Sequence, residues 1–218
     1  MKDVLPAPVY GAIRNHLIDR AKAAAEGWED GSDEEDTLTG DLGATLRTSW
    51  SPPLFVNGTA WRWRVRYKKF RGRGRGAFEK ESGADGIFQI EVTIGSGKHF
   101  KGLLFQAKKA GSLDGGLASQ IQRMEHLARG GSAVVVYGPR RYRAAMGSTY
   151  LQKHSTSGRI RITDLEPLES FLGDGFLPCM NGLRGMYYDA SRTLLLLPNG
   201  VAHRISVRHR ISVEAERA

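Results

Sequence analysis

Residue types that bind a metal ion and a phosphate group occur together in the middle of the chain: Asp85, Gln106 and Lys108. A carboxylate binds Mg²⁺, an amide carbonyl oxygen can complete the coordination of the ion, and an ammonium group holds a phosphate or the attacking water. These are the groups that hydrolysis of a phosphodiester bond requires. The question is therefore whether the chain places them side by side.

A β-hairpin is the element that would position them. Gly86–Ile94 and Phe100–Ala107 hold the β-branched and aromatic residues of buried strands. Between them, the sequence Gly-Ser-Gly-Lys at 95–98 has the composition of a turn. We therefore expect two antiparallel strands whose open end carries the polar residues.

The register of this hairpin follows from the turn. A symmetric turn over 95–98 sets Asp85 opposite Lys108 and Ile87 opposite Gln106. Because side chains alternate between the two faces of a strand, Gln106 and Lys108 share one face. Asp85, Gln106 and Lys108 should then converge at one end of the hairpin.

These residues carry a resemblance to a known family. Gly83-Ala84-Asp85 followed by Gln106-Ala107-Lys108 resembles the PD-(D/E)xK nuclease superfamily, in the branch whose third motif reads Gln-x-Lys. Ala84 stands in place of the proline, and Gln106 replaces a carboxylate, which removes one negative metal ligand. The resemblance implies an endonuclease dependent on Mg²⁺ (or Mn²⁺), with Asp85 and Gln106 holding the metal and Lys108 positioning or activating the attacking water.

The segment before the hairpin is expected to supply one more acid. Three leucines recur at helical spacing: Leu38, Leu42 and Leu46. Ser32 or Asp33 is a suitable N-cap, and Glu35 then lies on the first turn, on the same stripe as the leucines. Members of the resembled superfamily commonly carry a glutamate on this helix, which implies that Glu35 is a catalytic residue and metal ligand, with Asp41 as the fallback. The other acids of the run are expected to complement the helix dipole.

Basic residues mark the region between this helix and the hairpin. Thr59–Phe70 is predicted to be a strand with Trp61, Trp63, Val65 and Tyr67 in the core. Its opposite face and the following glycine-rich loop carry the predicted nucleic-acid contacts: Arg62, Arg64, Arg66, Lys68, Arg71, Arg73 and Arg75. The net charge of +9 agrees with a polyanionic partner. The alternative interpretation of the run is solvated surface charge.

Two further elements complete a core. Ser112–Gly130 has the apolar spacing of a helix, and Ser132–Gly138 is an apolar run typical of a strand buried on both faces. The predicted order is αβββαβ, with a mixed central sheet in an α/β (α+β) protein. This is the restriction-endonuclease-like core of the resembled superfamily, and the resemblance covers about 33–138. The expected organisation is an N-terminal helix (1–32), the nuclease-like core (33–163), and a C-terminal helix and β-hairpin extension packed on that core (164–218).

The composition restricts the cellular compartment in which the protein is expected. A single cysteine, Cys179, cannot form an internal disulfide, and the first residues lack the apolar core of a signal peptide. No apolar run approaches the about 20 residues of a spanning helix. We therefore expect a cytoplasmic protein with no membrane partner. His203 and His209 fall on one face of a strand-like segment and, without a further ligand, are interpreted as surface residues.

Three hypotheses remain open from the sequence. The first is the Mg²⁺-dependent endonuclease acting on DNA, with RNA not excluded; the resemblance implies a restriction or anti-phage defence role, as a homo-oligomer or with a partner protein of a defence system. The second is a catalytically inactive nucleic-acid-binding module within a larger defence or repair assembly, which the substitution at Gln106 suggests. The third is a protein-interaction component that uses 186–213.

Overall fold

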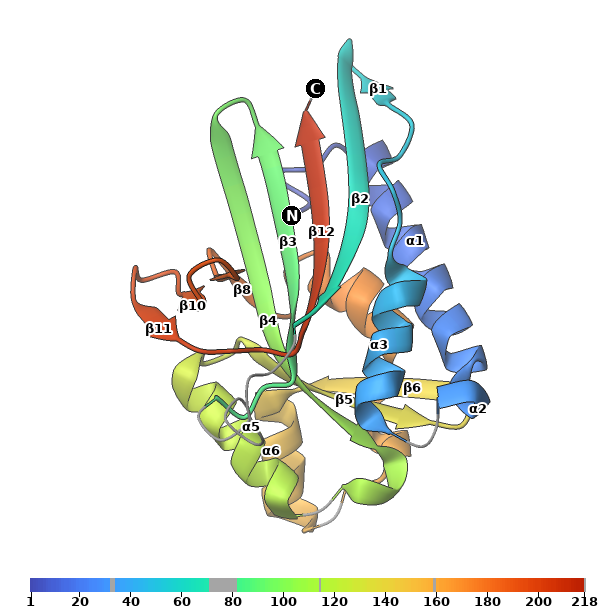
Figure 1. Cartoon of the computed structure of the whole chain (residues 1–218), viewed down its shortest axis with the longest axis vertical. Helices are drawn as coiled ribbons and strands as arrows, with labels where there is room; N and C mark the ends of the chain where they lie inside the picture. The colour runs from blue at the N-terminus through green and yellow to red at the C-terminus, as the bar shows by residue number, and fades with distance from the viewer. Residues whose placement is uncertain (32–33, 71–81, 114, 159, 218) are drawn as a thin grey trace.

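A nine-stranded mixed sheet and a small three-stranded antiparallel sheet form the frame of this α+β protein. The computed structural model describes residues 1–31, 34–70, 82–113, 115–158 and 160–217. The strands of the large sheet are β1 (Leu54–Val56), β2 (Thr59–Lys69), β3 (Gly86–Ile94), β4 (Gly97–Lys109), β5 (Ser132–Gly138), β6 (Arg141–Met146), β7 (Glu166–Pro167), β8 (Leu183–Arg184) and β12 (His209–Arg217). They follow the order β1-β2-β12-β3-β4-β5-β6-β7, and β8 pairs with β4 (Figure 1).

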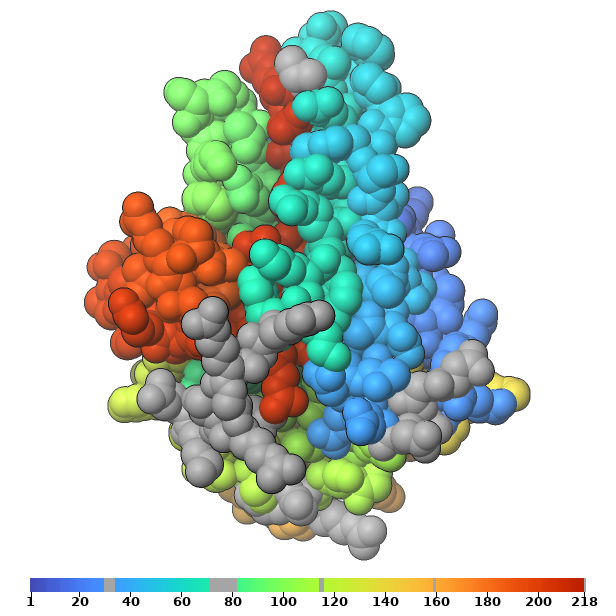
Figure 2. Space-filling model, in the orientation of Figure 1, coloured from blue at the N-terminus to red at the C-terminus, as the bar shows by residue number. Residues whose placement is uncertain are grey.

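Helices cover both faces of the large sheet. One face carries α1 (Ala7–Glu26), α3 (Glu35–Leu46), α7 (Leu168–Ser170) and a π-helix (Phe171–Phe176). The other carries α5 (Gly115–Leu127), α6 (Gly147–Ser157) and the small sheet of β9 (Tyr187–Asp189), β10 (Leu194–Leu196) and β11 (Ala202–Arg204). Short pieces complete the chain: α2 (Trp28–Gly31) and 3₁₀ turns at Ala110–Ser112 and Ile162–Asp164. In Figure 2 the surface of β2 lies between α3 and the small sheet.

The apolar patterns explain these layers. α1 buries Val9, Ile13, Leu17, Ala21 and Ala24, which form one stripe at helical spacing. The leucines of α3 are buried in the same core, and β5 is buried at every position because helices cover both of its faces. Burial of this kind is the dominant favourable contribution to folding, at roughly 25 cal/mol per Å² of apolar surface.

The hairpin of β3 and β4 is confirmed, with a shifted register. Ile94 pairs with Gly97, so the turn has only two residues, and Ile87 lies opposite Leu104 instead of Gln106. The predicted four-residue turn was therefore wrong, and every pairing is displaced by two positions. A shift of two leaves each side chain on its predicted face, because strand side chains alternate with period two. Asp85, just before β3, lies beside Gln106 and not opposite Lys108.

The C-terminal segment is only in part an extension. The small sheet lies outside the large one, but β12 lies between β2 and β3, antiparallel to the first and parallel to the second. Its apolar residues Ile211, Val213 and Ala215 are buried in the main core. The last strand of 164–218 is thus a central part of the core sheet.

Other elements differ in detail from the predictions. The helix expected over 112–130 begins at Gly115, after a 3₁₀ turn. Ile162–Asp164 forms a 3₁₀ turn, because Asp164 accepts a hydrogen bond from the backbone N–H of Arg161 and closes the chain locally. α6 was not predicted. No helix among the described residues is long and apolar enough to cross a membrane.

Candidate functional site

A pocket of about 120 Å³ opens where β3 and β12 begin and β4 ends. It is lined by Glu35, Asp36, Thr39, Asp85, Gln106, Ala107, Lys108, Arg208 and His209. All four residues predicted to be catalytic lie in this lining. Asp41, the fallback acid, is exposed on α3 and is not part of it.

The end of β4 holds the carboxylate of Asp85. Its Oδ2 accepts hydrogen bonds from the backbone N–H of Ala107 at 2.8 Å and from Nε2 of Gln106 at 2.6 Å. The backbone carbonyl of Asp85 accepts hydrogen bonds from the N–H groups of Arg208 and His209, at 2.8 and 3.1 Å. Two strands that are distant in sequence therefore fix Asp85, which is only 8% exposed.

Two glycines make this close packing possible. Gly83 has φ of +73°, and a Cβ atom there would lie 2.5 Å from the backbone oxygen of Gln120 on α5. A Cβ atom at Gly86 would lie 2.3 Å from the ring of Phe105 and 2.8 Å from the carbonyl oxygen of His209. The turn into β3 can therefore approach its neighbours only with glycine at both positions.

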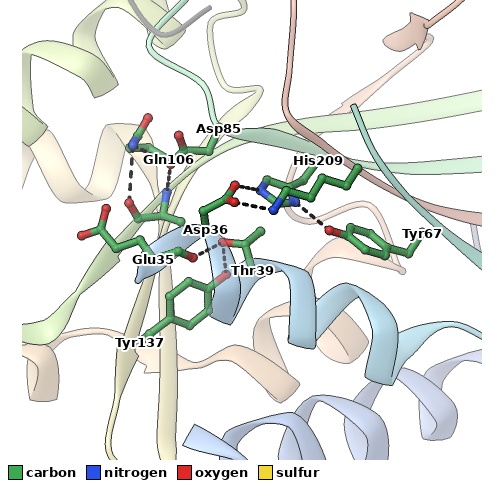
Figure 3. Close-up of polar contacts among 10 residues, drawn as sticks. Glu35, Asp36, Thr39, Tyr67, Asp85, Gln106, Tyr137 and His209 are labelled. Atoms are coloured by element: carbon green, nitrogen blue, oxygen red, sulfur yellow. Dashed lines mark hydrogen bonds and ion pairs between the residues drawn. The ribbon is translucent and has the colours of Figure 1, made fainter. Parts of the chain in front are cut away.

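Only the nitrogen of the Gln106 side-chain amide forms hydrogen bonds among the described residues. Its orientation follows from Asp85, because a carboxylate only accepts hydrogen bonds and must face Nε2. Gln106 is 1% exposed, and its Oε1 has no hydrogen-bond partner among the described residues (Figure 3). A buried carbonyl oxygen without a donor is unfavourable by about 1–3 kcal/mol. A cation in the pocket would offset this cost.

Glu35 reaches the site from the first turn of α3. Its Oε1 accepts a hydrogen bond from the backbone N–H of Lys109 at 3.0 Å, and its Oε2 lies 3.3 Å from Nζ of Lys108. The ion-pair partner of Lys108 is thus Glu35. Both side chains remain partly exposed, so the pair itself stabilises the fold only slightly. α3 begins one residue after Glu34, and the caps predicted at Ser32 or Asp33 lie outside the described residues.

Asp36 points away from Glu35, toward β12 and β2 (Figure 3). It accepts a hydrogen bond from Nε2 of His209 at 2.9 Å and forms an ion pair with Lys69. Nδ1 of His209 lies 2.9 Å from the hydroxyl of Tyr67. Because Asp36 can only accept, Nε2 carries the proton, and Nδ1 of the neutral ring accepts from Tyr67.

Burial shifts the protonation of this pair. Burial lowers the pKa of His209, and the nearby Asp36 only partly opposes that effect. Burial raises the pKa of Asp36, but the bonds from Lys69 and His209 outweigh it, so this pKa is lowered. His209 is 1% exposed, and the interpretation of it as a surface residue was wrong. Its two ring nitrogens are both satisfied inside the protein.

Hydrogen bonds of Thr39 hold the first turn of α3 against β5. The hydroxyl of Thr39 donates to the backbone carbonyl of Glu35 at 2.9 Å and accepts from the hydroxyl of Tyr137 at 3.0 Å. Tyr137 is completely buried on β5, and burial raises its pKa. The first turn of α3 is therefore attached to β2, β4, β5 and β12, which sets the position of Glu35.

The predicted nucleic-acid contacts on β2 divide into two groups. Arg62 and Arg64 form ion pairs with Glu216 and Glu214 of β12, and both stack over Trp50. Arg66 lies 3.4 Å from Glu214. Lys68 forms no ion pair within the part of the chain that the structure describes. Arg71, Arg73 and Arg75 lie outside the described residues.

The side chains of the pocket offer oxygen atoms, which are the ligands that a hard cation prefers. Within the described ranges, no three His, Cys, Asp or Glu side chains group together as metal ligands. The pocket offers instead the carboxylates of Asp85 and Glu35 and the unpaired amide oxygen of Gln106. Oxygen ligands of this kind, completed by water, suit Mg²⁺.

Sequence reasoning missed five residues around the site: Asp36, Thr39, Tyr137, Arg208 and His209. Thr39 lies one helical turn after the predicted Glu35, which was a usable signal, whereas Asp36 is adjacent to Glu35 and points elsewhere. His209 and Tyr137 gave none, because a single histidine or tyrosine on a strand has no pattern that marks it. Comparison of the chain with models of known protein families, with curated proteins and with solved structures found no match.

Proposed function

We propose that the protein is a metal-dependent endonuclease of the PD-(D/E)xK type, with a restriction-endonuclease-like core, that hydrolyses phosphodiester bonds in DNA with Mg²⁺ or Mn²⁺. The unpaired amide oxygen of Gln106, a residue whose Nε2 bonds to the carboxylate of Asp85, carries the proposal. It leaves an acceptor buried in a pocket that also holds Glu35 and Lys108. Such a nuclease suits a restriction or anti-phage defence system.

Asp85, Glu35 and Gln106 would hold the metal. Two carboxylates balance the charge of a divalent cation, and the amide oxygen adds a neutral ligand. When bound, the metal polarises the phosphate and lowers the pKa of a coordinated water. The chain must rotate the Gln106 amide to present Oε1 beside Asp85, which gives up the bond from Nε2.

Lys108 is placed to act on the phosphate. One N–H of its ammonium group is directed to Glu35, and an ammonium group has three donors. The remaining donors can orient the attacking water and stabilise the negative charge that develops on the phosphate. Glu35 thus positions Lys108 as well as contributing a ligand.

The test is a cleavage assay on plasmid, linear duplex and single-stranded DNA and on RNA, with Mg²⁺, Mn²⁺ or EDTA. Asp85→Asn keeps the shape of the side chain but removes its charge, so it should abolish cleavage while leaving DNA affinity nearly unchanged. Asp41→Asn, an exposed acid of α3, is the matched control and should cleave normally. Cleavage in EDTA, or by Asp85→Asn, would show that the site lies elsewhere.

One observation favours a second function. In the described geometry Nε2 of Gln106 satisfies Asp85 without any cation, as a protein that binds nucleic acid but does not cut it would do. The alternative is therefore an inactive nucleic-acid-binding module within a larger defence or repair assembly. It predicts salt-sensitive DNA binding that is the same in Mg²⁺ and EDTA, with no product under any condition.

A further inference from the structure

The face of the large sheet opposite α3 carries rows of side chains that cross β2, β12 and β3. The pairing of these strands aligns Lys68 with Arg210 and Ile87, and Arg66 with Ser212 and Gln89. It also aligns Arg64 with Glu214 and Glu91, and Arg62 with Glu216 and Thr93. The charge of these rows changes along the strands.

The two rows far from the pocket are neutralised. Glu216 pairs with Arg62, and Glu214 pairs with Arg64 at 2.6 Å. Both guanidinium groups also stack over Trp50, at 4.7 and 4.3 Å from the ring centre. Directly paired opposite charges stabilise neighbouring strands. Arg62 and Arg64 are therefore occupied in holding β2 against β12.

The two rows near the pocket keep a positive excess. Lys68 and Arg210 lie side by side over the ring of Phe70, and within the described ranges neither forms an ion pair. Burial lowers the pKa of Arg210 and the positive charge of Arg66 lowers it further, while the charges of Glu214 and Glu91 only partly oppose this shift. Three cations therefore share this end of the face, and Glu214 is the one acid bonded to any of them among the described residues. An anion would relieve this repulsion.

An unpaired hydroxyl lies in the same rows. Ser212 is 2% exposed, and its Oγ has no hydrogen-bond partner within the part of the chain that the structure describes. It is aligned with Arg66 and follows Arg210 by two positions on the same face of β12. A buried hydroxyl that lacks a partner in a cationic row is a donor for an oxyanion.

We propose that Lys68, Arg210 and Arg66, with the hydroxyl of Ser212 beneath them, bind the phosphate backbone of a nucleic acid. The identity of this ligand rests on the proposed function. Arg210 is aligned with Ile87, and Ile87 follows the pocket residue Asp85 by two positions, so this end of the surface adjoins the site. Of the contacts predicted on β2, Arg66 and Lys68, which are nearest the pocket, bind the nucleic acid. Arg62 and Arg64 instead hold β2 against β12.

The test uses the full chain and a short fluorescent duplex DNA in EDTA, so that binding is measured without cleavage. The double variant Lys68→Ala with Arg210→Gln should lower affinity by about tenfold or more and reduce the salt slope by about 2 units of log affinity per log salt. The control Arg62→Ala with Arg64→Ala removes the same charge. It should change the slope by less than half as much.

Three outcomes decide the matter. Equal effects of the two double variants would mean that binding follows net charge alone, and would overturn the assignment. Glu214→Gln should tighten binding, because it releases Arg64 and Arg66 from their partner; unchanged or weaker binding would contradict the proposal. If the unaltered protein binds the duplex, single strands and RNA no better than it binds heparin, the proposed function fails as well.

Discussion

Replacing Gln106 by glutamate tests the geometry of the pocket and the metal hypothesis separately. The bond from Nε2 of Gln106 to Oδ2 of Asp85 is 2.6 Å long and is made to a charged group. Such bonds contribute about 1.5–3 kcal/mol. Gln106→Glu removes it and places two carboxylates together, which at about 4 Å and an effective dielectric constant of about 20 repel by about 4 kcal/mol. Since the pair can relieve this repulsion by keeping a proton, we expect a net loss of about 2–4 kcal/mol at alkaline pH.

The pH dependence of that loss has a definite sign. In the folded variant, repulsion between the two carboxylates raises the pKa of the pair formed by Asp85 and the introduced carboxyl group above the value of about 4.3 for a free glutamate. Stability of the variant should therefore equal that of the unaltered protein below about pH 4.3, and should be lost as pH rises through the raised pKa. Urea unfolding over a series of pH values in EDTA measures this directly.

Mg²⁺ supplies the second half of the experiment. A divalent cation between the two carboxylates removes their repulsion, so Mg²⁺ should stabilise Gln106→Glu more than it stabilises the unaltered protein. Gln152→Glu, an exposed position on α6, adds the same charge and should change stability by less than about 0.5 kcal/mol in either solution. A variant as stable as the unaltered protein in EDTA at high pH would refute the Asp85–Gln106 contact. Destabilisation that Mg²⁺ does not reverse would leave the contact and refute the metal.

Three further predictions follow from the same contacts. Lys108→Ala should lower the cleavage rate by orders of magnitude with little change in DNA affinity, whereas Lys109→Ala, which keeps the backbone N–H bonded to Glu35, should cleave almost normally. Single-turnover rates distinguish them, and an essential Lys109 would contradict the strand register. Since the pKa of His209 is lowered from 6.5, stability should be full above that pH and fall below it; His209→Gln should flatten this part of the profile in urea unfolding. Tyr137→Phe, which deletes only the bond to Thr39, should destabilise the fold by about 1 kcal/mol in the same assay, and no change would mean that this bond does not hold α3.

The candidate site could be predicted because its signal is local. Alternation of apolar and polar residues places Gln106 and Lys108 on one face whatever the turn, and only a slip by an odd number of residues would separate them. The error in the turn shifted the register by two residues. Asp85 therefore lies beside Gln106 and not opposite Lys108, but it remains in the pocket. Leucine spacing located Glu35 by the same kind of short-range pattern.

The position of β12 could not be predicted in this way. An alternating strand has the same pattern at the edge of a sheet, in its centre or in a separate hairpin, and the β2 residues that β12 pairs with lie 140 (Lys69 and His209) to 156 (Trp61 and Arg217) positions earlier. For this reason Arg62 and Arg64 looked like free cations in the sequence. Their partners, Glu214 and Glu216, can be identified only once the strand order is known.

The same strand order makes the pocket depend on the whole fold. The backbone carbonyl of Asp85 accepts its two hydrogen bonds from Arg208 and His209, and the ring of His209 holds Asp36 on α3. Until β12 enters between β2 and β3, the turn before β3 and the first turn of α3 each lack one of their partners. Contacts of such long sequence separation form late and cooperatively, because the loop-closure entropy must be overcome first. The acid on the hairpin and the acid on the helix therefore both depend on β12, so loosening β12 at His209 should be detected at both Asp85 and Glu35.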